Sequence, residues 1–182
     1  MMIHGPNGDY VKVTENNRLW TDAIAESPLA HACRYHAQAF AWTMVSYDFD
    51  AGDTILLVRN DSTTLMLYID YVWAWVKENS VIVLQHPTAT FTIDGTAVVG
   101  VNMNTASGVL ADATAKGDET GNTQGDIIDV RYDYSTQSPG VRFLEHDGII
   151  ALGYHDAIGV DVVVDGGNAC ECTIHGYYHA VD

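Results

Sequence analysis

The chain has 182 residues and is strongly acidic, because 24 Asp and Glu against 8 Lys and Arg give a net charge of −16. Such a surface repels phosphate backbones and offers no basic cluster, so the composition argues against nucleic acid as a partner. With 47% apolar and 18% charged residues, the chain should fold as one domain, or as one domain with an arm. Eighteen Asp against three Lys is compatible with an ordinary acidic surface or with adaptation to high salt, which screens self-repulsion.

Targeting signals and disulfides are not expected. The first ten residues, MMIHGPNGDY, have neither the basic region nor the apolar core of a secretory signal. The longest apolar run, residues 64–76, is interrupted by Asp70 and is shorter than the roughly 18 residues of a membrane span. The three cysteines have no framework spacing. We therefore expect no membrane partner.

Residues 1–45 differ from the rest and are predicted to form an N-terminal arm. Tyr10–Val13 and Arg18–Trp20 could pair as a small hairpin. The Ala-rich stretch 27–39 begins with Ser27 and Pro28, a favourable start for a helix. An extended segment lying on another surface is equally compatible with this stretch. The arm should thus contain a hairpin and either a short helix or an extended segment.

From Thr43 onward, short runs of β-branched and aromatic residues alternate with turns of Gly, Asp and Asn. The predicted strands are 43–47, 54–60, 64–76, 80–86, 89–94, 96–104, 127–134, 141–144, 149–152, 158–164 and 169–180. Asp94-Gly95 is the clearest hairpin turn, because a type I′ turn needs positive φ at both central residues. Many short strands with hardly any helix predict an all-β, jelly-roll-like β-sandwich over residues 46–182. Residues 105–126, which are small and acidic, are predicted to form a projecting loop.

The strand over residues 64–76 is apolar on both faces, so both faces should be covered. The partner sheet would cover one, and the arm or another subunit the other; a central strand in a thick monomeric core is the alternative. Simple alternation places six residues on one face, and these are the candidate oligomer interface: Leu65, Leu67, Ile69, Tyr71, Trp73 and Trp75. The row of Tyr71, Trp73 and Trp75 could instead stack against sugars.

No arrangement of residues predicts a catalytic or metal site. Four side chains near the C-terminus are of types that bind zinc: Cys170, Cys172, His175 and His179. The period of a strand places the two cysteines on one face and the two histidines on the other. The pairs His146-Asp147 and His155-Asp156 flank turns. Known nucleophile, phosphate-binding and zinc-protease motifs are lacking, and the acids of residues 105–126 suit a solvated loop better than a Ca²⁺ site. We expect no enzyme and no cofactor.

Several segments resemble head decoration or cement proteins of tailed viruses of bacteria and archaea. They are DYVKVTENNRLWTDAIAES with Asn-Arg-Leu at 17–19, HAQAFAWT at 36–43, AGDTILLVRND at 51–61, and HDAIGVDVVVDGGNACECTIHGYYHAVD at the end. The likeness spans nearly the whole chain and rests on structural motifs. It implies a jelly-roll-like domain, usually trimeric, on the outer capsid lattice, and it carries over no catalytic residue.

The expected function is therefore that of a non-enzymatic virion protein on the capsid surface, which binds the major capsid protein, forms a homotrimer and stabilises the head. The arm residues expected to contact the capsid are Tyr10, Val11, Val13, Leu19 and Trp20. A carbohydrate-binding β-sandwich module of a receptor-binding or tail-associated appendage is the alternative. A cupin-like enzyme is a third reading, but it would need convergent His and carboxylate ligands that this spacing does not supply.

Overall fold

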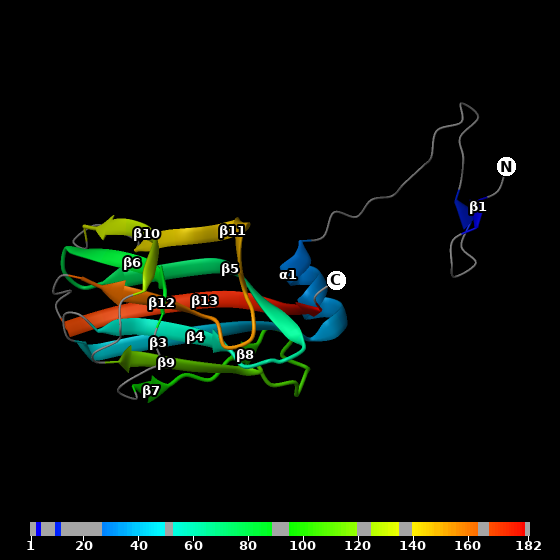
Figure 1. The fold of residues 1–182 in the computed structure, drawn as a ribbon, viewed down its shortest axis with the longest axis horizontal. Coiled ribbons are helices and arrows are strands. Elements are labelled where there is room, and N and C mark those ends of the chain that lie inside the picture. Colours follow the sequence, from blue (N-terminus) through cyan, green and yellow to red (C-terminus); the bar gives the residue numbers. More distant parts are fainter. Residues whose placement is uncertain are drawn as a thin grey trace, which may run out of the picture.

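The computed structural model describes residues 3–4, 10–11, 27–49, 53–88, 95–119, 125–134, 140–163 and 168–180. Two antiparallel sheets pack as a β-sandwich, which confirms the predicted fold class (Figure 1). One sheet has the order β10 (Asp126–Asp133), β6 (Ser80–His86), β12 (Ala157–Val162), β4 (Thr54–Asn60), β9 (Ala113–Glu119) and β7 (Thr96–Ala97). The other has the order β11 (Val141–Leu152), β5 (Leu65–Val76), β13 (Asn168–Ala180), β3 (Ala39–Phe49) and β8 (Val101–Asn102).

The strand pairing is that of a jelly roll. The pairs nest about residues 87–125: β6 pairs with β10, β5 with β11, β4 with β12, and β3 with β13. The chain therefore resembles one long hairpin whose two arms are wound together into two sheets. Residues 87–125 add the remaining strands, with β8 beside β3 and β9 beside β4.

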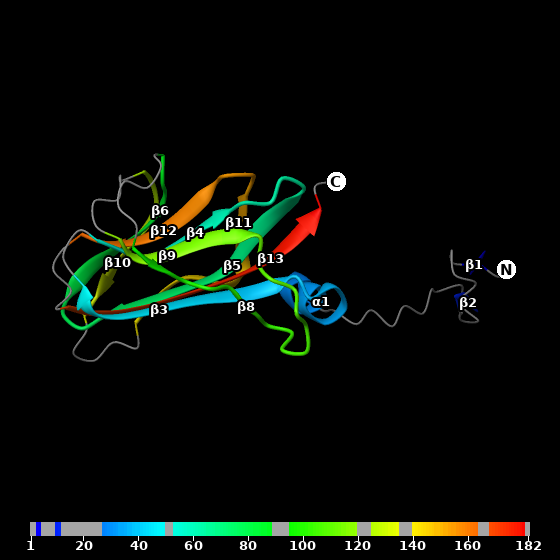
Figure 2. The same ribbon diagram turned by 90° about the horizontal axis from the view of Figure 1, so that it is seen from below.

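The two sheets lie face to face as two layers (Figure 2). The core lies between them, and buried side chains from both sheets fill it. Phe40 and Trp42 of β3 are buried there, and the Phe40 ring meets the Tyr178 ring edge-on at 5.8 Å. In β12 every residue is buried. Burying each large apolar side chain contributes roughly 1.5–3 kcal/mol, so this interlayer is the main source of stability.

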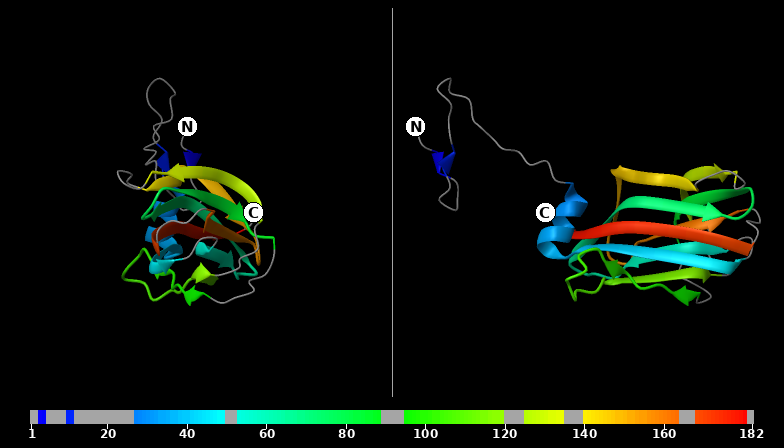
Figure 3. Two further views of the ribbon diagram at one scale, coloured as in Figure 1. Left: turned by 90° about the vertical axis from the view of Figure 1, so that its left-hand side faces the viewer. Right: turned by 180° about the vertical axis from the view of Figure 1, so that it is seen from behind.

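A short helical segment precedes β3, which confirms the helical alternative for this stretch. It consists of α1 (Pro28–His31) and a π-helical turn, η1 (Ala32–His36). Ser27 caps its start, since the Ala30 N–H donates to Ser27 Oγ at 3.2 Å. Leu29 and Ala32 pack on Ala39 and Tyr177, so the segment covers one end of the outer face of the five-stranded sheet (Figure 3).

The structure corrects the predicted boundaries of the arm and of the loop. Residues 39–45, assigned to the arm, belong to β3. The projecting loop predicted over 105–126 is wrong for residues 113–119, which form β9 and pair with β4 along its length. Gly117 is buried there, and a Cβ at this position would lie 2.5 Å from Met44 Cγ. Gly117, which favours a loop in the sequence, is thus explained by close packing within the sandwich.

Other predictions fall near or beyond the described residues. Tyr10 and Val11 form β2 (Tyr10–Val11), which pairs with β1 (Ile3–His4). The partner predicted for this hairpin, residues 18–20, lies outside the described residues, as does the strand predicted over 89–94. Within the described ranges, no helix is long and apolar enough to cross a membrane.

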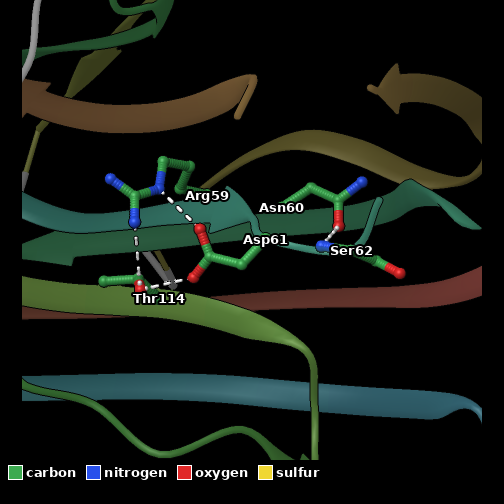
Figure 4. Close-up of polar contacts among 5 residues, drawn as sticks. All are labelled: Arg59, Asn60, Asp61, Ser62 and Thr114. Carbon is green, nitrogen blue, oxygen red and sulfur yellow. Dashed lines mark hydrogen bonds and ion pairs between the residues drawn. The ribbon is translucent and has the colours of Figure 1, made fainter. Parts of the chain in front are cut away.

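A buried asparagine joins the two sheets at one end of the sandwich. Asn60 Nδ2 donates to the carbonyl oxygens of Leu65 at 3.0 Å and of Leu152 at 2.9 Å. Its Oδ1 accepts the Ser62 N–H at 3.0 Å (Figure 4). Asn60 is the last residue of β4, whereas Leu65 and Leu152 belong to the other sheet. These hydrogen bonds therefore connect the two layers.

Arg59 and Asp61 form a half-buried ion pair next to Asn60. Arg59 Nε donates to Asp61 Oδ1 at 2.7 Å, and Thr114 Oγ1 donates to Asp61 Oδ2 at 2.5 Å (Figure 4). Burial would raise the pKa of Asp61, but the hydrogen bonds from Arg59 and Thr114 outweigh it and hold the pKa below its usual value. Asp61 therefore keeps its negative charge to a lower pH in the folded protein than an aspartate in the unfolded chain does.

Candidate interaction surface

Strand β5 contains a one-residue bulge that the sequence pattern does not reveal. Along β13, Gly176 is the partner of Ile69 and His175 is the partner of Tyr71. Asp70 is consequently an extra residue on β5, with no counterpart on β13. Since side chains alternate along a strand, one extra residue exchanges the two faces for every residue beyond it.

The bulge divides the six residues predicted as an oligomer interface into two groups. Three lie on the inner side, where Leu67 and Ile69 are fully buried in the core and Leu65 packs against it. The interface prediction is wrong for Leu67 and Ile69, because a second chain cannot reach them. The other three are half-buried on the outer face of the sheet: Tyr71, Trp73 and Trp75.

Two further side chains on β3 extend this surface. Val45 and Tyr47 are 45% and 81% exposed, and they alternate with core-facing Met44 and Ser46. We call the surface formed by Val45, Tyr47, Tyr71, Trp73 and Trp75 the aromatic face. Val45 and Tyr47 were not among the predicted candidates, although alternation along the predicted strand 43–47 places both residues on one face together with Thr43.

Polar side chains of β13 run between the two rows of the aromatic face. Glu171 is paired in register with Trp75 on one side and Val45 on the other. Thr173 follows, and its Oγ1 lies 3.1 Å from that of Thr43. The surface therefore combines flat apolar rings with hydrogen-bonding groups, a composition typical of recognition surfaces.

Among the described residues, the same side of the sheet is covered at one end and exposed at the other. Near the helical segment, Tyr177 is buried and its ring stacks on that of Tyr68, with centroids 5.4 Å apart. Figure 2 shows the segment at the end of β3. Further along the strands, the rings of Tyr71 and His175 stack at 4.8 Å, and exposure rises to its highest value at Tyr47. The helical segment thus covers only part of the apolar side.

An exposed ion pair borders the aromatic face on β11. Arg142 Nη1 donates to Glu145 Oε1 at 2.8 Å, and this bond raises the pKa of Arg142. In register, Arg142 lies opposite Trp73 and Glu145 opposite Tyr71. The border therefore carries one positive and one negative charge rather than an excess of acid.

The cysteines and histidines near the C-terminus lie on opposite sides of β13, as the strand period predicts. Cys170 and Cys172 are buried in the core, whereas His175 stacks on the outer face and His179 is exposed. Burial raises the pKa of the Cys172 thiol. Within the part of the chain that the structure describes, no group of three or more His, Cys, Asp or Glu side chains is placed to hold a metal ion.

The remaining candidate residues are placed as follows. Of the arm residues expected to contact the capsid, Tyr10 and Val11 form β2, and the others lie outside the described residues: Val13, Leu19 and Trp20. His155 and Asp156 lie in the turn before β12, where Asp156 Oδ2 accepts the Gly153 N–H at 3.0 Å. Their position in a turn agrees with the sequence interpretation.

Comparison with known proteins gives no relative from which a role could be transferred. No family model, curated protein or solved structure matches this chain. Functional inference therefore depends on the surfaces of the molecule.

Proposed function

We propose that this chain is a non-enzymatic virion structural protein that decorates the outer capsid lattice and stabilises the head. One observation carries the proposal: the aromatic face presents large apolar side chains on the outer face of a sheet that the chain's own helical segment covers only in part. Trp and Tyr are the residues that most often dominate binding at protein interfaces. The lattice would be that of the major capsid protein, the partner that the sequence resemblance implies.

Self-association as a trimer belongs to the same proposal. In the trimer, Tyr71, Trp73 and Trp75 of β5 would contact the neighbouring copy, which leaves Val45 and Tyr47 on the β3 side of the aromatic face to meet the lattice. Sixteen excess negative charges oppose the approach of neighbouring copies. Their repulsion acts over a Debye length of about 10 Å at 0.1 M salt and about 3 Å at 1 M. Apolar contact persists in salt, so docking and trimer formation should strengthen as salt rises.

Sedimentation of capsid particles with added protein tests the proposal. The double variant Tyr47→Ser, Trp75→Ser should bind particles at least tenfold more weakly than wild type, because it removes two apolar anchors. Tyr154→Ser is the matched control, since this tyrosine is also exposed but lies beyond the opposite end of β11. Equal retention of both variants, or retention that is unchanged down to millimolar salt, would contradict docking through the aromatic face.

A carbohydrate-binding module is the second candidate, and one observation favours it. Tyr71, Trp73 and Trp75 alternate along one strand, about 6.7 Å apart, beside the hydrogen-bonding side chains of Glu171 and Thr173. Such a row could stack against successive sugar rings. Glycan-induced changes in tryptophan fluorescence that Trp73→Ser abolishes would favour this function over capsid docking.

A further inference from the structure

Strand β10 forms an edge of the six-stranded sheet, and several of its exposed side chains are apolar. Among the strands that the structure describes, β6 is the one that pairs with it. Ile127 and Tyr132 are 63% and 64% exposed, and Ile128 and Val130 are also exposed. Edge strands of stable monomers usually carry charges, prolines or bulges that prevent pairing with another chain. Strand β10 does carry charged residues, but its central Asp129 and Arg131 are of opposite sign, and apolar side chains lie between and beside them.

The backbone at the middle of the strand is satisfied locally. The Val130 N–H donates to the Asp129 carboxylate at 2.8 Å, and this bond is exposed to solvent. Asp129 Oδ2 also accepts Arg131 Nε at 2.9 Å. A strand from another chain could replace both of these hydrogen bonds without exposing the core, because the Val130 N–H and the Asp129–Arg131 ion pair are not buried.

The sequence of β10 is complementary to itself in one antiparallel register. When two copies are centred on Val130, Asp129 of each lies opposite Arg131 of the other, and the two Val130 residues lie opposite one another. This register creates two opposite-charge pairs and one apolar cross-strand pair, which are arrangements that stabilise a sheet. The pairing of β10 with β6 shifts register between Ile127 and Asp129, so the regular part of the contact begins at Asp129. The ion pair is accessible for this exchange, since the Asp129 and Arg131 side chains are 34% and 50% exposed.

A second register, centred on Tyr132, would also pair opposite charges, but the burial of Asp133 excludes it. This register would place Arg131 opposite Asp133. The Asp133 side chain is buried, however, and its Oδ2 accepts the Val76 N–H at 3.2 Å. It therefore cannot receive an arginine from outside.

We propose that a second copy of this chain pairs with β10 edge to edge, antiparallel across a two-fold axis at Val130. The contact joins the two six-stranded sheets into one. It uses a different sheet from the aromatic face, so it does not depend on the proposed capsid docking, and each contact can be disrupted alone.

Charge exchange by mixing tests the register. Asp129→Arg places two arginine pairs across the axis, and Arg131→Asp places two aspartate pairs there, so each variant should dimerise at least tenfold more weakly than wild type in sedimentation velocity. An equimolar mixture should restore dimers, because the arginines of one variant would then lie opposite the aspartates of the other. Rescue by mixing cannot arise from a role of either residue within one chain. A monomeric wild type at all concentrations, or a wild-type dimer whose variants do not rescue one another, would overturn the proposal.

Cross-linking tests the axis itself in a Cys33→Ser background, where the remaining cysteines are buried. Opposite residues in an antiparallel pair lie about 4.5–5.5 Å apart at Cα, within the range that a disulfide spans. Val130→Cys should therefore form a disulfide-linked dimer under mild oxidation. Tyr132→Cys is the control, because its two copies would be offset by four residues, about 13 Å. Equal cross-linking at both positions would overturn the two-fold axis at Val130.

Discussion

Replacing Asn60 by alanine should strongly destabilise the protein, although it removes only a small polar side chain. Asn60 is fully buried at the end of β4. The substitution would leave the Leu65 and Leu152 carbonyl groups and the Ser62 N–H without the partners they have in the wild type. Since two of these groups belong to the opposite sheet, the loss would act on the packing of the two layers.

The expected magnitude follows from the number and burial of the bonds. A typical hydrogen bond contributes about 1 kcal/mol net, and a buried group left unpaired costs about 1–3 kcal/mol. For three bonds the loss should be about 3–5 kcal/mol, a large part of the roughly 5–15 kcal/mol by which a domain is stable. With a slope of about 2 kcal/mol per molar urea, the unfolding midpoint should fall by about 1.5–2.5 M.

Asn102 offers a matched control within the same protein. Its Nδ2 donates to the Ala37 and Val109 carbonyl groups at 2.8 and 3.0 Å, and its Oδ1 accepts the Asn104 N–H at 2.9 Å. The bonding pattern equals that of Asn60, but Asn102 is only half-buried. Water can replace the lost bonds, so Asn102→Ala should cost about 1 kcal/mol.

Urea unfolding followed by tryptophan fluorescence and by circular dichroism compares the two variants. Coincident curves with an unchanged slope would show that the midpoint shift reports stability. If Asn60→Ala lost no more free energy of unfolding than Asn102→Ala, burial would not determine the strength of these bonds, and the reasoning would be refuted.

Three further outcomes are expected. The stability difference between wild type and Asp61→Asn should shrink from about pH 5 downward, because the bonds from Arg59 and Thr114 outweigh burial and hold the folded pKa of Asp61 below its unfolded value; urea midpoints at pH 7 and pH 3 check this. In thiol titration with a coloured disulfide reagent, the native protein should react at Cys33 alone, because the other cysteines are buried, and unfolded protein at all three. Gly117→Ala should lower the free energy of unfolding by about 1–3 kcal/mol through overpacking; an unchanged thermal midpoint would contradict the close packing of β9.

The sequence predicts most of the fold because apolar alternation and turn residues mark the strands independently of one another. The strands predicted over 54–60 and 80–86 have the observed bounds. Two runs predicted separately, 141–144 and 149–152, form the single strand β11. Its pairing with β5 shifts register between residues 145 and 150. The gap in the sequence pattern therefore marked an irregularity within a strand rather than a turn between two.

Two features could not be predicted, each for a physical reason. Strand β9 is composed of small and polar residues, which propensity alone reads as loop; the narrow space around Gly117 accounts for the glycine among them. The bulge at Asp70 depends on how β5 aligns with β13, which is a contact between distant parts of the chain. Without that alignment, Leu67 and Trp73 appear to share a face. The carboxylate in an otherwise apolar run is the only local sign of the interruption.

The placement of the arginines links the two proposed contacts to the charge of the whole protein. A net charge of −16 makes contact between copies unfavourable wherever acid predominates. Arg131 lies at the centre of the β10 edge and Arg142 borders the aromatic face, and each already pairs with a carboxylate. Each surface thus combines exposed apolar side chains with an arginine, although Glu171 on the aromatic face and Asp126 on β10 leave both surfaces acidic. The arginine lowers the like-charge repulsion at each surface relative to a surface that carries carboxylates alone, so these are the places where an acidic chain of this composition can approach a neighbour.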